Sequence, residues 1–99
     1  MLYRIGGFSM CGPPSTVEKC NQLNLAVKYS DWPPANWLHR TAKVGDEVAV
    51  RIGGDFHYPD ETTEQLGVHD VLLIAGGVGI NPLASIFFHI HDIKGRILN

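Results

Sequence analysis

An unbroken run of apolar residues that ends in a cluster of glycines constrains this chain more than any other feature. Residues 71–83 read Val-Leu-Leu-Ile-Ala-Gly-Gly-Val-Gly-Ile-Asn-Pro-Leu. The five apolar residues at its start are typical of a parallel β-strand that is covered on both faces. Asn is a favoured N-cap and Pro suits the first helical position, so Asn81 and Pro82 predict the start of a helix. From there Leu83, Ile86, Phe87 and Ile90 recur at the spacing of one helical face.

The glycines at positions 76, 77 and 79 suggest what this turn could do. Glycine adopts positive φ without strain and lets a ligand approach the backbone. The free N–H groups and the dipole of a helix start favour a phosphate or diphosphate. No Lys-Ser or Lys-Thr follows the glycines, which excludes a Walker A loop, and the spacing is not Gly-x-Gly-x-x-Gly. On spacing alone, a tight strand–helix turn without a ligand is an equally good interpretation.

This turn is similar to the pyridine-nucleotide pyrophosphate loop of the ferredoxin–NADP reductase superfamily. Two further segments stand in the same order as in the superfamily: Gly-Gly-Phe-Ser-Met-Cys at 6–11 and Leu-Ala-Val-Lys-Tyr at 25–29. Members pair an FAD-binding β-barrel with a nucleotide-binding domain. The resemblance implies that the NAD(P) pyrophosphate lies on Gly76, Gly77, Val78 and Gly79, in a loop shaped by Asn81 and Pro82.

The resemblance also implies contacts with FAD. Phe8 corresponds to an aromatic residue that packs on the flavin, and Ser9 to a hydroxyl near its reactive nitrogen, which makes Ser9 the candidate catalytic residue. Gly6 stands where the superfamily has an arginine. Pro34, Ala35 and Asn36 correspond to a helix start whose backbone N–H groups meet the FAD phosphates. From the residues alone, Phe8 could equally be a core aromatic residue beside a strand hydroxyl.

These patterns predict a mixed α+β fold. A partial antiparallel β-barrel of the FAD-binding type, with strands at 8–11, 23–29 and 48–52, is followed by the first βα unit of an α/β nucleotide-binding domain. Residues 12–22 read as a polar loop, and the double proline at 33–34 predicts a turn into a short helix. The predicted domains are 1–54 and 69–99, joined by a linker at 55–68. Both domains look truncated, so we expect exposed sheet edges that aggregate or need a protein partner.

Composition excludes several classes of function. The net charge is −2 with scattered basic residues, which argues against a nucleic-acid surface, and the apolar runs are too short to span a membrane. The five histidines lie in separate segments or two apart on a predicted helix, so we expect no metal site. Cys11 and Cys20 are expected to stay thiols in an intracellular protein. The resemblance implies a mitochondrial relative, although residues 1–7 show no import sequence.

The predicted function is therefore that of a flavin-dependent oxidoreductase. Such a protein passes a hydride between NAD(P)H and FAD, and an unknown electron acceptor takes part. The alternative is a non-enzymatic fragment that binds a nucleotide weakly or folds only against a partner. Both interpretations rest on the same glycine turn, so the sequence motif does not separate them.

Overall fold

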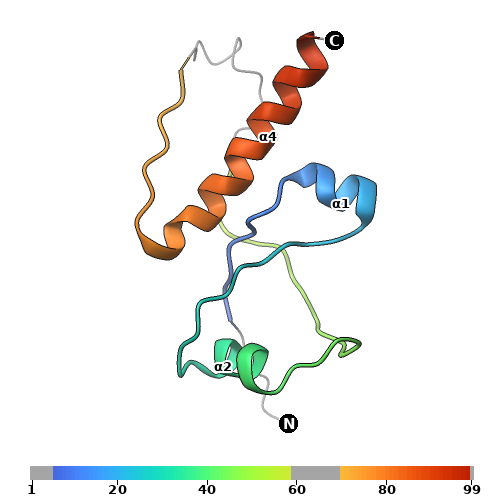
Figure 1. The fold of residues 1–99 in the computed structure, drawn as a ribbon, viewed down its shortest axis with the longest axis vertical. Helices are drawn as coiled ribbons and strands as arrows, with labels where there is room; N and C mark the ends of the chain where they lie inside the picture. Colours follow the sequence, from blue (N-terminus) through green and yellow to red (C-terminus); the bar gives the residue numbers. More distant parts are fainter. Residues whose placement is uncertain (1–5, 59–69, 99) are drawn as a thin grey trace.

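The chain forms three α-helices and one 3₁₀ turn within the part that the structure describes. The structure is a computed structural model that describes residues 6–58 and 70–98, with the backbone alone for 95–98. The helices are α1 (Pro14–Cys20), α2 (Pro33–Arg40) and α4 (Ile80–Leu98), and the 3₁₀ turn η1 (Gly77–Gly79) leads directly into α4. Figure 1 shows α4 as the longest element, with α1 beside it and α2 at the far end of the molecule.

The two short helices begin where prolines fix the backbone. Pro13 is the extended residue before α1, which carries Pro14 in its first turn, and Pro33 and Pro34 open α2. Proline fits these positions because its missing N–H would have no helical acceptor. α1 ends at Cys20, and the next residue, Asn21, adopts a left-handed φ of 53° and donates its N–H to the Val17 carbonyl. The predicted helix after the double proline is confirmed, whereas the predicted loop at 12–22 is wrong because most of it is α1.

The predicted partial β-barrel with a following βα unit is wrong. Within residues 6–58 and 70–98 there is no β-strand, and only one isolated antiparallel bridge joins Met10 to Leu25. A strand needs a neighbour at about 4.8 Å that accepts and donates backbone hydrogen bonds. Segments 48–52 and 71–75 have strand-like composition, but no described segment pairs with either of them. Both segments have the composition of strands, yet each is an extended stretch of chain that belongs to no sheet in the described part of the molecule.

The described residues enclose very little core. Ala35 of α2, which is 4% exposed, is the one buried side chain among them. The radius of gyration is 16.0 Å, compared with about 13 Å for a compact domain of this length. Large apolar side chains stay in contact with water along both extended segments, among them Val48, Val50, Ile52, Leu72 and Ile74.

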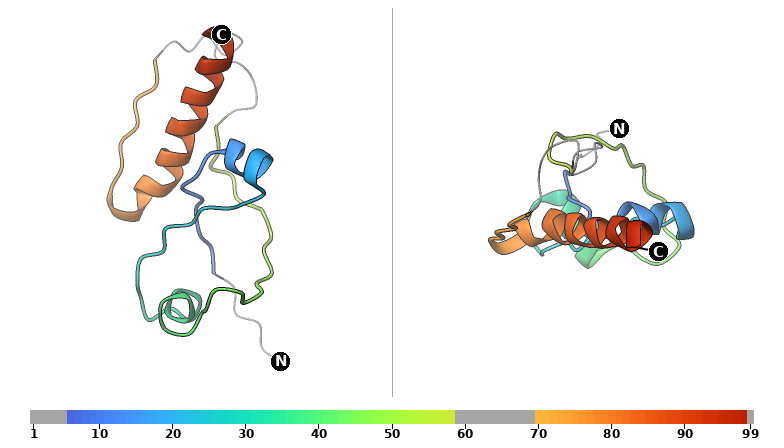
Figure 2. Two further views of the ribbon diagram at one scale, coloured as in Figure 1. Left: turned by 45° about the vertical axis from the view of Figure 1, so that its right-hand side comes forward. Right: turned by 90° about the horizontal axis from the view of Figure 1, so that it is seen from above.

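Among the side chains that the structure describes, three form hydrogen bonds that hold α4 against the N-terminal part of the chain. Asn81 Nδ2 donates to the Ala26 carbonyl at 2.7 Å, and Ser85 Oγ donates to the Gly12 carbonyl at 2.8 Å. Further along the helix, Ser15 Oγ of α1 donates to Asp92 Oδ2 at 2.6 Å. Both views in Figure 2 show α1 next to α4. The extended segment 70–76 runs beside α4 on another side and ends in the glycine turn (Figures 1 and 2).

The predicted domain division stays a prediction. Most of the predicted linker, residues 59–68, lies outside the described residues. None of the helices seen in the described ranges is both long enough and apolar enough to cross a membrane.

We expect the segment 71–75 to drive self-association of the chain. Leu72 and Ile74 are 84% and 81% exposed, and unpaired apolar extended chain readily pairs with another copy. Replacing both by lysine should lower light scattering and the sedimentation coefficient at high concentration, with the circular-dichroism helix signal unchanged. The double variant T41K/H91K, which adds the same charge at other exposed positions, is the control. Equal loss of association in both variants would assign the effect to net charge.

Candidate functional site

The glycine turn has a defined backbone geometry. Gly76 is extended, with φ −125° and ψ 124°, and Gly77 has a φ of +54°. The Gly79 N–H donates to the Gly76 carbonyl at 2.9 Å, and the Ile80 N–H donates to the carbonyls of Gly77 and Val78. A left-handed φ favours glycine at position 77, because other L-residues are strained there.

The turn leaves two backbone donors in open space. The N–H groups of Gly77 and Val78 have no acceptor among the described residues. A Cβ added at Gly76, Gly77 or Gly79 would meet no atom within 4 Å. These amides sit one turn before a 19-residue helix, where the helix dipole adds partial positive charge. The arrangement can accept an oxyanion without displacing any described side chain.

Asn81 and Pro82 lie within the first turn of α4. The helix begins at Ile80, so Asn81 is not the helix cap that its sequence position predicts. Instead its side-chain nitrogen donates to the Ala26 carbonyl. In this structure Asn81 therefore attaches the start of α4 to residue 26.

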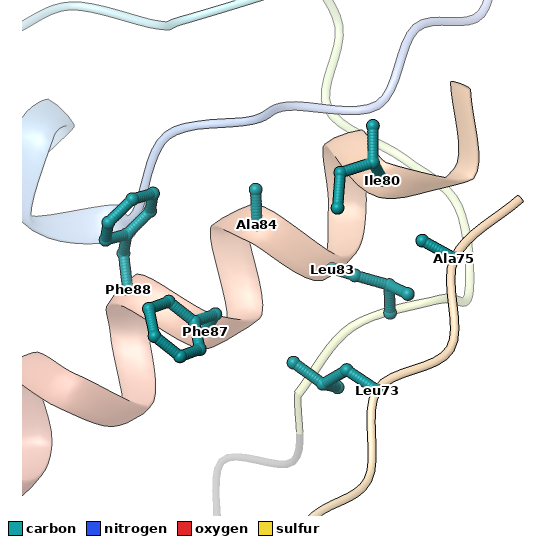
Figure 3. A pocket seen from close by; sticks show the side chains of 7 residues that line it. All are labelled: Leu73, Ala75, Ile80, Leu83, Ala84, Phe87 and Phe88. Atoms are coloured by element: carbon teal, nitrogen blue, oxygen red, sulfur yellow. The ribbon is translucent and has the colours of Figure 1, made fainter. Parts of the chain in front are cut away.

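An apolar groove of about 300 Å³ lies between the extended segment and α4. Figure 3 shows Leu73 and Ala75 facing Leu83 and the ring of Phe87. Its lining consists of apolar side chains alone: Leu73, Ala75, Ile80, Leu83, Ala84, Phe87 and Phe88. This groove confirms that Leu83 and Phe87 share a face of the helix, and it contains no polar side chain that could orient a ligand.

The structure brings two of the predicted flavin contacts close together. A Cβ built on Gly6 would lie 2.7 Å from Pro34 Cβ and 2.9 Å from Phe8 Cε2, so both rings lie against this glycine. Phe8 is 38% exposed and Ser9 is exposed. Because Pro34 is a backbone-anchored ring, an arginine at position 6 would force α2 or the Phe8 segment to move. The packing gives a physical reason why glycine stands at the position of the superfamily arginine.

The start of α2 offers few free amides. Pro34 has no N–H, and the Asn36 N–H donates to the Trp32 carbonyl at 2.8 Å. Ala35 alone of the three keeps an N–H with no described acceptor, and this residue is buried. Residues 34–36 thus differ from the glycine turn, where two neighbouring amides are open.

Sequence reasoning missed a polar cluster around Tyr29. The Tyr29 hydroxyl donates to Asp31 Oδ1 at 3.3 Å and accepts from Asn36 Nδ2 and Arg40 at 3.5 Å. The Arg40 guanidinium lies 5.2 Å from the centre of the Tyr29 ring, and His39 Nε2 lies 2.6 Å from the Val27 carbonyl. These contacts fix the last turn of α2 to residues 27–31. The sequence signal that could have indicated this cluster is the pair of basic residues, His39 and Arg40, at the end of the predicted helix.

The described residues contain no group of three His, Cys, Asp or Glu side chains that could hold a metal ion. Cys11 and Cys20 are both free thiols. Cys11 makes a long contact of 3.4 Å with the Asn24 carbonyl, which is ordinary for a thiol at the edge of a paired segment.

Comparison with known proteins finds relatives of this chain. It is 50% identical over 90 residues to the oxidoreductase NAD-binding domain-containing protein 1 of Xenopus tropicalis, and the match covers 91% of this chain. The chain is a homologue of these proteins. It spans 28–32% of the length of the relatives of this name. No protein-family model matches the chain, and no solved structure matches it.

Two further relatives are more distant, and one is named as a reductase subunit and the other as a flavohemoprotein. The glycine betaine monooxygenase reductase subunit of Chromohalobacter salexigens is 32% identical over 77 residues, covering 76% of this chain and 20% of the relative. Flavohemoprotein A of Dictyostelium discoideum is 42% identical over 52 residues, covering 52% of this chain and 12% of the relative. These matches confirm the resemblance to the ferredoxin–NADP reductase superfamily.

Gly6 provides a direct test of the packing between Phe8 and α2. The variant Gly6→Ala should shift the fluorescence of Trp32 and Trp37, because the added methyl group collides with Pro34 at the start of their helix. Gly7→Ala is the matched control, since a Cβ there meets nothing within 4 Å. Identical spectra for G6A and the unsubstituted chain would contradict the packing.

Proposed function

We propose that this chain supplies the dinucleotide-binding turn of an NAD(P)H-dependent flavin oxidoreductase. The diphosphate of NAD(P)H would lie on the backbone of Gly76, Gly77, Val78 and Gly79. Phe8 and Ser9 would contribute to the flavin side of the reaction. The bound nicotinamide cofactor supplies a hydride, which such oxidoreductases pass between NAD(P)H and FAD.

The pair of open amides at Gly77 and Val78 carries this proposal. Both donors lack an acceptor among the described residues, and no described atom fills the space beside the glycines. A diphosphate would receive their hydrogen bonds and the partial charge of the α4 start. The residues present therefore fit the diphosphate of NAD(P). The word "NAD-binding" in the names of the relatives supports the same ligand.

FAD fits the described residues less well. The resemblance implies diphosphate contacts from the amides of 34–36, but Pro34 has no N–H and the Asn36 N–H is bonded to Trp32. The remaining amide belongs to buried Ala35. Residues 34–36 therefore do not make a diphosphate cradle for FAD. The proposed flavin contacts are those of Phe8 and Ser9, whose exposed side chains can meet a ring.

A second candidate function is nucleotide binding without catalysis. The observation that favours it is the single buried side chain, Ala35, among the described residues, since hydride transfer requires rigid placement of the reacting atoms. None of the described contacts indicates where an electron acceptor would bind. Steady oxidation of NADH or NADPH by the chain with FAD and an electron-accepting dye would favour the enzyme. Binding without turnover would favour the second candidate.

The variant Gly77→Val tests the assigned diphosphate site. Valine at a φ of +54° is strained by about 1–2 kcal/mol, and its side chain would occupy the space left for the ligand. We expect NADH and NADPH to bind about tenfold more weakly, as measured by fluorescence titration. Gly53→Val, at a glycine with open surroundings and without a positive φ, should bind as the unsubstituted chain does. Unchanged affinity in G77V would contradict the assignment of the diphosphate to this turn.

A further inference from the structure

We propose that Asn81 is a positioning residue that fixes the glycine turn against the segment carrying Ser9. It acts through the Ala26 carbonyl and not by contact with the dinucleotide. This inference rests on the proposed function, because it concerns how the diphosphate turn and the flavin-side segment are held in register. It assigns Asn81 a role that its position in the loop motif does not predict.

The segment carrying Ser9 is paired with the segment carrying Ala26. Met10 and Leu25 form an antiparallel bridge, and the Cys11 N–H donates to the Asn24 carbonyl at 3.0 Å. Ser9 precedes one bridged residue and Ala26 follows the other. An antiparallel register therefore sets Ala26 opposite Ser9. A side chain that is bonded to Ala26 is therefore held close to Ser9, the candidate catalytic residue.

The helix that follows the glycine turn is bonded to both paired segments. Asn81 Nδ2 donates to the Ala26 carbonyl at 2.7 Å, and Ser85 Oγ donates to the Gly12 carbonyl at 2.8 Å. Residues four apart share one helical face, so the two bonds fasten a single face of α4 to two carbonyls, one from each segment. Two attachment points restrict rotation of the helix about its own axis as well as its separation from the segments.

The attachment is closest to the turn at Asn81. Gly79 lies two residues before it, and η1 continues directly into α4. Loss of the Asn81 bond would let the first turn of α4 move relative to residue 26. The glycine turn would move with it as a unit, because its own hydrogen bonds keep the amides of Gly77 and Val78 in place relative to each other. The Ser15–Asp92 bond holds α4 much further along, by α1, and cannot replace a restraint at the helix start. Asn81 is thus the side chain that links the position of the diphosphate donors to the Ser9 segment.

The test compares NADH or NADPH, whose nicotinamide would extend from the glycine turn toward the flavin-side segment at Ser9, with inorganic pyrophosphate, which would fill the turn alone. The variant Asn81→Leu has a side chain of similar volume and no hydrogen-bond donor. In the 99-residue chain it should weaken binding of NADH or NADPH about three- to tenfold, while binding of inorganic pyrophosphate stays as in the unsubstituted chain. Ser85→Ala should act in the same direction, and Ser85→Thr, which keeps the hydroxyl, should restore the affinity. His91→Ala, at an exposed position on the same helix, is the control.

Two results would overturn the proposal. Equal weakening of pyrophosphate and dinucleotide in N81L would mean that Asn81 acts on the diphosphate site itself and not on the register between the turn and the Ser9 segment. Unchanged affinity for both ligands would mean that the bond to Ala26 positions nothing.

If the unsubstituted chain binds none of these ligands, the proposed function fails, and the attachment is judged by nuclear magnetic resonance. Movement of the Ser9 and Ala26 amide resonances in N81L, and not in H91A, then supports it. Unmoved resonances refute it.

Discussion

The attachment of α4 to the N-terminal part by side-chain hydrogen bonds is the interaction on which the rest of this structure depends. Apolar burial usually dominates folding, yet Ala35 is the one buried side chain in the described ranges. Among the described residues, the bonds from Asn81, Ser85 and Ser15 attach the long helix to the N-terminal part, together with the ring contact between Tyr58 and His89. Each such bond contributes only about 0.5–1.5 kcal/mol, so the arrangement is sensitive to single substitutions at these positions.

The glycine turn can bind an anion because two of its backbone amides have no acceptor among the described residues. Gly77 takes a left-handed φ, the turn closes on itself through the Gly79–Gly76 bond, and two amides stay open. At α2 the opposite holds, because prolines remove donors and the Asn36 amide is bonded within the helix. The nicotinamide-nucleotide side of the proposed function is thus better supported by this chain than the flavin side. The homologues carry the name of an NAD-binding domain, and the match spans 28–32% of their length.

Local signals in the sequence predicted local structure well. The double proline before α2 and the period of Leu83 and Phe87 both correspond to observed helices, because capping and periodicity depend on neighbouring residues. Strand predictions failed at 48–52 and 71–75, because a strand depends on a partner that composition does not reveal. α1 was missed because Pro14 and a short polar segment also suit a loop. The hydrogen bond from Asn81 to the Ala26 carbonyl could not be predicted, because residues 26 and 81 meet only in the folded chain.

The central claim is that the amides of Gly77 and Val78 bind a diphosphate, and a titration of the ¹⁵N-labelled chain with inorganic pyrophosphate tests it most directly. The account predicts that the amide resonances of Gly77 and Val78 move first and furthest, with saturable dependence on ligand concentration. The Ala35 resonance should stay in place. Saturable shifts centred on α2, or no shift at the glycine turn at any concentration, would contradict it.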